Sequence, residues 1–180
     1  KNNSNMKLEL KKIKLGPGSE ETTQFTAELY VDGKFAAHCD NSGKGGPTDI
    51  RAYSKGDAEL TKKAEEYCST LPDVDLGGGT TIPMNLEHWV DDQVYKAEKE
   101  KEIKRVLVKL NKKCEKGIIV ISQSLLDKFK AGKPVDVAYR EWNIKVPISS
   151  LSDAQKRAYV LQITNVLKGD EFIYNENLPK

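Results

Sequence analysis

Alternating apolar and polar residues dominate the first third of the chain. Apolar residues occupy every second position over residues 6–15, 25–31 and 35–39, with a one-residue slip at Lys11-Lys12. Strict alternation is typical of a strand with one buried face, and the slip indicates a β-bulge. Asp32-Gly33 separates two of these runs and predicts a hairpin turn. We therefore expect a three-stranded antiparallel meander, with a short fourth strand after it.

Helical spacing replaces the alternation over residues 55–71. Ser54 and Asp57 match a capping box, and apolar residues then recur every three or four positions. Pro72 ends this helix because proline cannot continue the backbone hydrogen-bonding pattern. Residues 72–83 hold three consecutive glycines and predict a flexible connection.

A long helix is expected after Asn85, which can cap it. It carries two apolar stripes, and residues 98–102 between them contain no apolar side chain. We expect one continuous helix whose two ends pack on different partners, with Gly117 at its C′ position. A break near residue 100 and a strand over residues 106–110 stay open as alternatives.

The last third of the chain mixes short elements. We expect, in order, a buried strand over 118–121, a helical turn over 124–129, a bent strand over 135–146, a helix from a Ser152/Gln155 capping box to about residue 167, and a strand over 171–174. This order predicts the α+β class: an antiparallel meander sheet with two to three helices packed on one face, including one long helix. We expect a single domain over residues 6–180, preceded by a disordered lead or expression remnant over residues 1–5.

Composition narrows the classes of function. With 29 Lys and Arg against 27 Asp and Glu, the net charge of +2 gives no overall field for nucleic acid or membrane. Cys39, Cys68 and Cys114 form no paired motif and indicate free thiols used as small core residues. No run of about eighteen apolar residues is present, so we expect a cytoplasmic protein with no membrane contact, no cofactor and no structural metal.

The strongest candidate site is the glycine loop, which we define as residues 42–48. Its glycine amides, lysine and hydroxyl groups can turn toward one anion, and phosphate is the usual anion in such loops. The predicted ligand-binding residues are Ser42, Gly43, Lys44, Gly45, Gly46 and Thr48. The alternative is a plain connection between strands, because the spacing matches neither a Walker loop nor a dinucleotide fingerprint.

Other residues near this loop or of similar chemistry are secondary candidates. His38 lies on a predicted strand beside the loop, and Gly78, Gly79 and Thr80 belong to the second glycine-rich stretch. If the two stretches meet in space, they frame one pocket. His88 lies on the long helix with acidic residues three and four positions later, an arrangement that a general base or cation site could use. A solvated acidic face is the favoured interpretation, and no catalytic signature is present.

The far end of the long helix is basic. The patch consists of Lys104, Arg105, Lys109, Lys112 and Lys113. It could contact the phosphates of nucleic acid, although cations at a helix C-terminus are also favoured by the helix dipole. No aromatic platform of the RNA-binding type is evident. The two offset apolar stripes of this helix leave room for a homodimer.

Residues 19–34 and 41–46 resemble small accessory proteins carried by bacteriophages and related mobile elements, and residues 86–92 and 112–114 are similar too. The resemblance implies action inside a bacterial host, where such proteins sequester nucleotide-type immune signals or block host proteins. Our leading hypothesis is a non-enzymatic protein that holds a phosphate-bearing small molecule at the glycine loops. The alternatives are an accessory factor that binds a host protein or nucleic acid through the basic helix end and, least favoured, a hydrolase dependent on a metal or His88.

Overall fold

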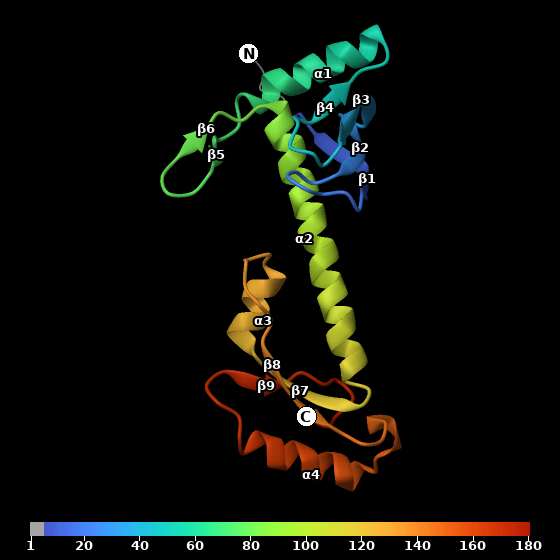
Figure 1. The fold of residues 1–180 in the computed structure, drawn as a ribbon, viewed down its shortest axis with the longest axis vertical. Coiled ribbons are helices and arrows are strands. Elements are labelled where there is room, and N and C mark those ends of the chain that lie inside the picture. The colour runs from blue at the N-terminus through green and yellow to red at the C-terminus, as the bar shows by residue number, and fades with distance from the viewer. Residues whose placement is uncertain (1–5) are drawn as a thin grey trace. The chain divides into compact units, whose positions relative to one another are not determined.

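The computed structural model describes residues 6–180 and has an α+β fold with antiparallel sheets and one long helix, as the sequence predicts (Figure 1). The chain divides into two compact units, an N-terminal unit that ends at Glu98 and a C-terminal unit that begins at Lys99. Each unit has its own hydrophobic core, and residues 98–102 contribute no apolar side chain that could link them.

A four-stranded antiparallel meander forms the sheet of the N-terminal unit. Its strands are β1 (Leu8–Leu15), β2 (Phe25–Val31), β3 (Lys34–Asn41) and β4 (Asp49–Arg51), in the order β1-β2-β3-β4. The hairpin turn lies at Asp32 and Gly33, whose φ angles are 49° and 79°. The expected bulge is also confirmed, because the pairing with β2 shifts register between Lys11 and Lys14.

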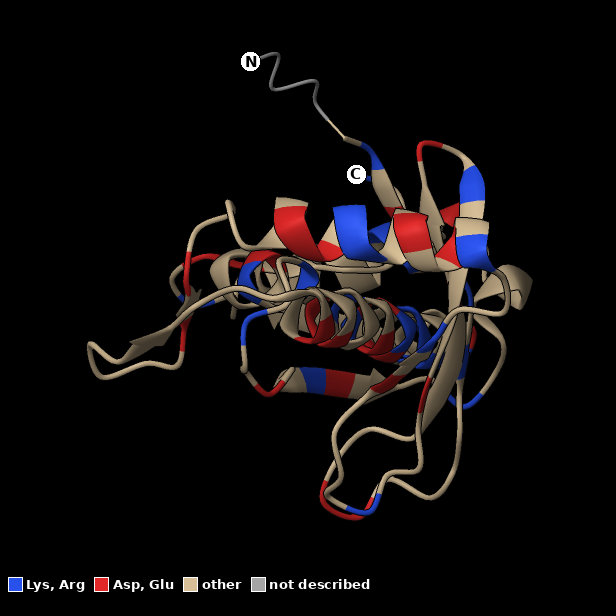
Figure 2. Cartoon of the chain, turned by 90° about the horizontal axis from the view of Figure 1, so that it is seen from above, with Lys and Arg blue, Asp and Glu red and all other residues tan. Residues whose placement is uncertain are grey.

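The inner face of this sheet is covered by α1 (Lys55–Cys68) and by the first part of α2 (Leu86–Lys113). The buried residues of this core are Phe25, Ala27, Leu29, Val31, Ala36, Ala37, Cys39, Ala64, Cys68, Leu86, Val90 and Val94. Both predicted helix starts are confirmed: the Ser54 hydroxyl accepts from the Asp57 amide, and the Asn85 side chain accepts from the His88 amide at 2.7 Å. Acidic and basic bands alternate along the exposed side of α1 (Figure 2).

The outer face of the same sheet carries a row of aromatic side chains, which the sequence analysis did not recognise. Tyr30 meets Phe35 edge to face, and Phe35 stacks on Tyr53 with ring planes 2° apart. The Lys11 ammonium lies 4.6 Å from the centre of the Tyr30 ring. The alternation predicts Phe35 in the core, but the pairing of β2 with β3 shifts register between Leu29 and Tyr30 and turns Phe35 to the outer face. Tyr53 lies beyond the end of β4, where alternation no longer indicates which face a side chain occupies.

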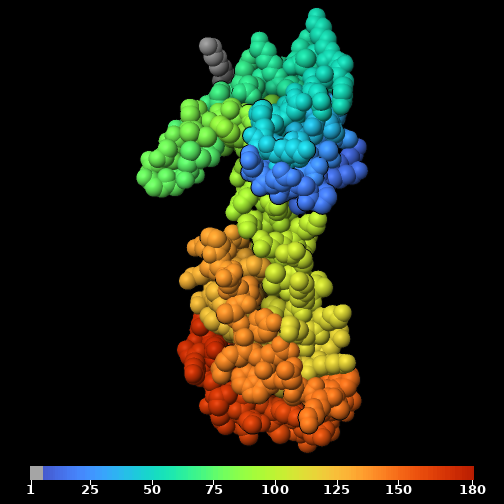
Figure 3. Space-filling model, in the orientation of Figure 1, coloured from blue at the N-terminus to red at the C-terminus, as the bar shows by residue number. Residues whose placement is uncertain are grey.

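The second glycine-rich stretch is a small hairpin of β5 (Val74–Asp75) and β6 (Thr81–Ile82). Its tip is Gly77–Gly79, and all three of these glycines have positive φ. The hairpin projects from the rest of the N-terminal unit (Figure 3). Strands of two residues are too short to produce a readable alternation, so the sequence indicated only a flexible connection here.

Helix α2 runs without interruption from Leu86 to Lys113, which excludes both a break near residue 100 and a strand over residues 106–110. Its two apolar stripes pack in different cores, as expected: one in the N-terminal unit and the other, with Leu110 and Cys114 buried, in the C-terminal unit. Gly117 is not a helix C′ residue. It begins the next strand instead.

The C-terminal unit is built around strand β7 (Gly117–Ser122). Strands β8 (Tyr139–Asn143) and β9 (Glu171–Ile173) pair antiparallel with its two edges, and the helices are α3 (Gln123–Lys130), η1 (Ile148–Ser150) and α4 (Asp153–Thr164). Ile118 and Val120 pack in a cluster with residues of α4, whereas Ile119 packs with Leu110 of α2. Burial of both faces of β7 explains its continuous apolar run.

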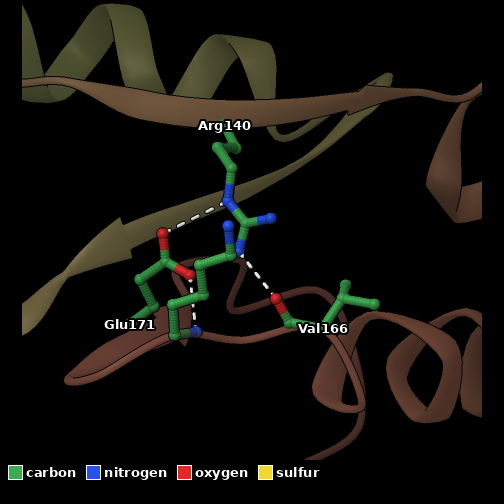
Figure 4. A network of polar contacts seen from close by, with 4 residues as sticks. Arg140, Val166 and Glu171 are labelled. Atoms are coloured by element: carbon green, nitrogen blue, oxygen red, sulfur yellow. Dashed lines mark hydrogen bonds and ion pairs between the residues drawn. The ribbon is translucent and has the colours of Figure 1, made fainter.

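Two expectations for the C-terminal unit are corrected. The strand expected over residues 135–146 is confined to β8, because the amides of Val135 and Ala138 donate to carbonyls two positions back and form tight turns before it. The helix after Ser152 has the expected capping box but ends at Thr164. Arg140 of β8 joins the two outer strands: it pairs with the Glu171 carboxylate of β9 and donates to the Val166 carbonyl at 3.0 Å (Figure 4).

Across residues 6–180, no helix combines the length and the apolar character that crossing a membrane requires.

Candidate functional site

The glycine loop is organised by the buried side chain of Asn41, at the end of β3. Its Oδ1 accepts from the Gly43 amide at 2.9 Å and from the Thr22 hydroxyl at 2.8 Å. Its Nδ2 donates to the Gly46 carbonyl at 3.0 Å and to the Thr48 hydroxyl at 3.3 Å. A buried amide with donors and acceptors all engaged holds surrounding backbone in one conformation. The loop is therefore a defined structure.

Thr48 ties the loop to the first turns of α2. Its amide donates to Glu87 Oε1 at 2.9 Å, and its hydroxyl donates to Asp91 Oδ1 at 2.5 Å. Glu87 and Asp91 are four positions apart and therefore lie on the same side of the helix. These bonds bring two carboxylates of α2 to the base of the glycine loop.

Two of the amides predicted to hold a phosphate already have acceptors within the protein. The Gly43 amide donates to Asn41, and the Gly45 amide donates to the Thr22 hydroxyl at 3.3 Å. The Glu21 carboxylate lies so close to Gly45 that a Cβ there would clash with it, so an acidic group also approaches the loop. The phosphate site stays a prediction, but an anion there would have to displace these bonds and lie near carboxylates.

A cleft of about 410 Å³ lies between the glycine loop and α2. Its lining combines an apolar wall with hydroxyl, amide and acidic groups: Thr22, Thr23, Phe25, Asn41, Gly45, Gly46, Pro47, Glu87, His88, Asp91 and Val94. Two carboxylates line this cleft, and no lysine or arginine of residues 6–180 does. We call this space the acidic cleft.

The charge of Asp91 is incompletely compensated. Partial desolvation raises the pKa of its carboxyl group, and the nearby charge of Glu87 raises it further, against the hydrogen bond from Thr48 and the field of His88. One oxygen of each carboxylate is committed to Thr48, and no bond within residues 6–180 reaches the other oxygen of either group. The acidic cleft thus offers two acceptor oxygens beside an apolar wall.

The structure brings together some predicted site residues and separates others. Gly45 and Gly46 line the acidic cleft and Thr48 anchors it, whereas Lys44 is exposed and lies outside its lining. Ser42 lines a neighbouring hollow with Lys14 and Gln24. His38 lies on the outer face of the sheet, with its Nε2 3.9 Å from Asp40.

The pocket framed by both glycine stretches is not formed. Gly78, Gly79 and Thr80 are outside the lining of the acidic cleft, and their hairpin extends on the other side of α2 from the sheet (Figures 1 and 2).

His88 faces the acidic cleft, but its acidic neighbours do not form one cluster with it. Its Nδ1 lies 3.2 Å from the Pro83 carbonyl, while Asp92 pairs with Lys96 at 2.6 Å. Among the described residues, no three His, Cys, Asp or Glu side chains are placed to hold a metal ion. The three cysteines are free and buried, and burial raises their thiol pKa values to about 11 or 12, which keeps them unreactive.

The predicted basic patch lies on the second half of α2. Lys104, Arg105, Lys109 and Lys112 are exposed there. Lys113 differs from them, because its ammonium pairs with Glu141 at 2.7 Å and lies over the Tyr139 ring.

Asn41, Thr22 and Thr23 were missed as site residues. A signal for Asn41 was present: it continues the inward positions of Ala37 and Cys39, and a polar side chain on a buried face must find hydrogen-bond partners nearby. Thr22 and Thr23 carried no such signal, because only the folding of the meander brings them beside residues 41–48.

Comparisons of the chain with protein-family models, with curated proteins and with solved structures found no match.

Proposed function

We propose that this protein is a non-enzymatic binding protein whose acidic cleft receives a protonated amine or guanidinium group. The observation that carries the proposal is the cleft lining, which, among the described residues, holds the carboxylates of Glu87 and Asp91 and no lysine or arginine. A carboxylate in a partly desolvated cleft gains most from a ligand that brings the opposite charge.

The walls of the cleft favour a ligand with a carbon stem. Phe25 and Val94 supply apolar surface, while the hydroxyl groups of Thr22 and Thr23 can orient a polar head. A lysine or arginine side chain of a partner protein fits this description, because both carry an apolar stem that ends in a cation. A free polyamine carries the same chemistry without the protein.

This proposal takes up the protein-partner alternative in a different place, at the cleft rather than at the basic helix end. A nucleotide-type ligand is less well supported, because phosphate would meet two carboxylates and amides that already have acceptors. The phage-related origin and the cytoplasm of a bacterial host are the setting in which we propose that it acts.

The test compares ligands that differ only in charge. A glycine-flanked lysine peptide, the same peptide with an acetylated lysine, spermidine and ATP are each added to the purified protein, and the melting temperature is measured. A ligand at a hundred times its dissociation constant stabilises the folded state by about 2.7 kcal/mol. We expect the lysine peptide to raise the melting temperature and its acetylated form to leave it unchanged.

The matched variants are Glu87→Gln with Asp91→Asn in the cleft, and Asp92→Asn one residue outside it. Both cleft substitutions keep an acceptor oxygen for Thr48, so the loop can stay in place while the charge is removed. Calorimetric binding of the lysine peptide should be lost in the cleft variant and kept in the Asp92 variant. Equal binding of the acetylated peptide contradicts the proposal. If ATP binds and Lys44→Ala abolishes that binding, the result supports the phosphate prediction instead. If spermidine alone raises the melting temperature, the ligand is a free polyamine.

A further inference from the structure

The C-terminal unit is strongly basic, although the whole chain is nearly neutral. From residue 99 onward the sequence holds 17 Lys and Arg against 10 Asp and Glu, a net charge of +7. Charge separated in this way within one chain is typical of proteins with a polyanionic partner.

Much of this positive charge lies on one side of α2. At about 100° per residue, Lys101, Lys104, Arg105, Lys109 and Lys112 fall within roughly 140° of the helix circumference. All five are exposed, and the other residue in this arc, Val108, is 65% exposed. The apolar stripe that packs in the core lies on the opposite side. We call the side with the five cations the basic face.

None of the five cations forms an ion pair with a carboxylate among the described residues. Surface cations on helices are usually interspersed with acidic side chains three or four positions away. Here no Asp or Glu falls within the arc between Lys101 and Lys112. The helix dipole accounts only for the last turn, where Lys112 lies, because its effect fades within one turn.

We propose that the basic face of α2 binds the phosphate backbone of double-stranded nucleic acid without sequence preference. Its five cations extend over about 17 Å of helix, at 1.5 Å per residue. Duplex DNA presents one phosphate charge per roughly 1.7 Å, so several phosphates lie within reach of one such face. This inference concerns the C-terminal unit and does not depend on the function proposed for the acidic cleft.

A duplex fits this face better than a single strand does. Single strands are held by bases that stack on aromatic side chains, and the basic face holds no aromatic residue. It also holds no Asn or Gln that could read base edges. A row of cations alone recognises phosphate charge and spacing, which is the sequence-independent component of duplex binding.

The test measures binding of the full chain to a fluorescently labelled duplex by anisotropy, at several salt concentrations. Five phosphate contacts predict a slope of log K against log salt of about −4 to −5. The triple variant Lys104→Glu, Lys109→Glu and Lys112→Glu should bind at least tenfold more weakly and lower that slope by about 2 to 3.

The matched control reverses three exposed lysines of the same unit outside the basic face: Lys128→Glu, Lys130→Glu and Lys133→Glu. It changes the net charge equally and should keep most of the affinity. If the basic-face variant does not fold by circular dichroism, the three alanine substitutions replace it, because alanine favours helix.

Three results would overturn the proposal. The first is unchanged duplex binding in the basic-face variant, and the second is an equal loss in the control variant, which would indicate attraction by net charge alone. The third is tighter binding of a single strand or of polyglutamate than of the duplex, which would assign the face to another partner.

Discussion

The two units of this protein carry opposite charges. The N-terminal unit holds 12 Lys and Arg against 17 Asp and Glu, a net charge of −5, whereas the C-terminal unit carries +7. The whole-chain value of +2 conceals this contrast, because it indicates only that the chain as a whole has no strong field. From this contrast we expect the N-terminal unit to bind a cationic ligand and the C-terminal unit to bind a polyanion.

The two units nevertheless use the same structural device, a buried asparagine that holds irregular backbone. Asn41 organises the glycine loop. Asn175 accepts from the Ile119 amide of β7 at 2.7 Å and donates to the Gly117 carbonyl at 2.9 Å, so it holds the end of the chain against the central strand. The units differ in what the asparagine supports: a cleft in one and the packing of a tail in the other.

The largest expected effect comes from the separate cores. Leu29→Ala removes a fully buried side chain of the N-terminal unit and should lower the free energy of unfolding by about 2–5 kcal/mol. Hydrogen exchange followed by mass spectrometry should then show lost protection mainly before residue 98. Leu161→Ala, at a position that is 66% exposed, serves as the control with little expected effect. Equal loss of protection in both units would show that they unfold as one.

The second effect comes from the two asparagines. Asn41→Leu and Asn175→Leu each leave buried backbone groups without partners, and each should cost about 2–4 kcal/mol of stability. The losses should differ in function, because only Asn41→Leu disturbs the acidic cleft. Chemical denaturation measures the cost, and calorimetry with the lysine peptide measures the functional difference. Lysine-peptide binding that fails in both variants would mean that the units are not functionally separate.

The third effect is a reciprocal test of the charge contrast. The cleft variant with Glu87→Gln and Asp91→Asn should lose at least tenfold in affinity for the lysine peptide, and its duplex binding should change less than twofold. Reversal of Lys104, Lys109 and Lys112 should give the opposite pattern. Both ligands are measured on both variants at one salt concentration, because salt alone changes duplex affinity. If either variant lost binding of both the lysine peptide and the duplex, the two units would not bind their ligands independently.

The smallest effect concerns pH. The raised pKa of Asp91 means that the folded state binds a proton more readily than the unfolded state does. Stability should therefore fall slightly as pH rises from the ordinary carboxyl value of about 4 through the raised value. Asp91→Asn cannot titrate, so its melting temperature relative to the parent protein should increase across that window. A difference that stays constant with pH would show that Asp91 titrates normally.

Sequence patterns predicted regular elements well and the site only in part. The alternation over residues 25–31 correctly predicted which side chains enter the core, and Ser54, Asn85 and Ser152 marked three helix starts, because these signals are local. The alternation was wrong at Phe35, because a register shift in the pairing of β2 with β3 turns this side chain to the outer face and buries Ala36 instead. The same reasoning placed Glu87, His88 and Asp91 on a helix, but it could not bring them beside the glycine loop.

What the sequence determined by itself is the α+β class, the meander and the continuous apolar stripes of α2, since hydrophobic periodicity depends on neighbours along the chain. Only the tertiary structure decided that the amides of Gly43 and Gly45 have internal acceptors, and that Thr48 meets two carboxylates of α2. The tertiary structure also shows that the chain forms two compact units that meet at residue 98, and that these units carry net charges of −5 and +7. These features arise from contacts between segments distant in sequence, and no local pattern encodes which hydrogen-bond partner such a contact will supply.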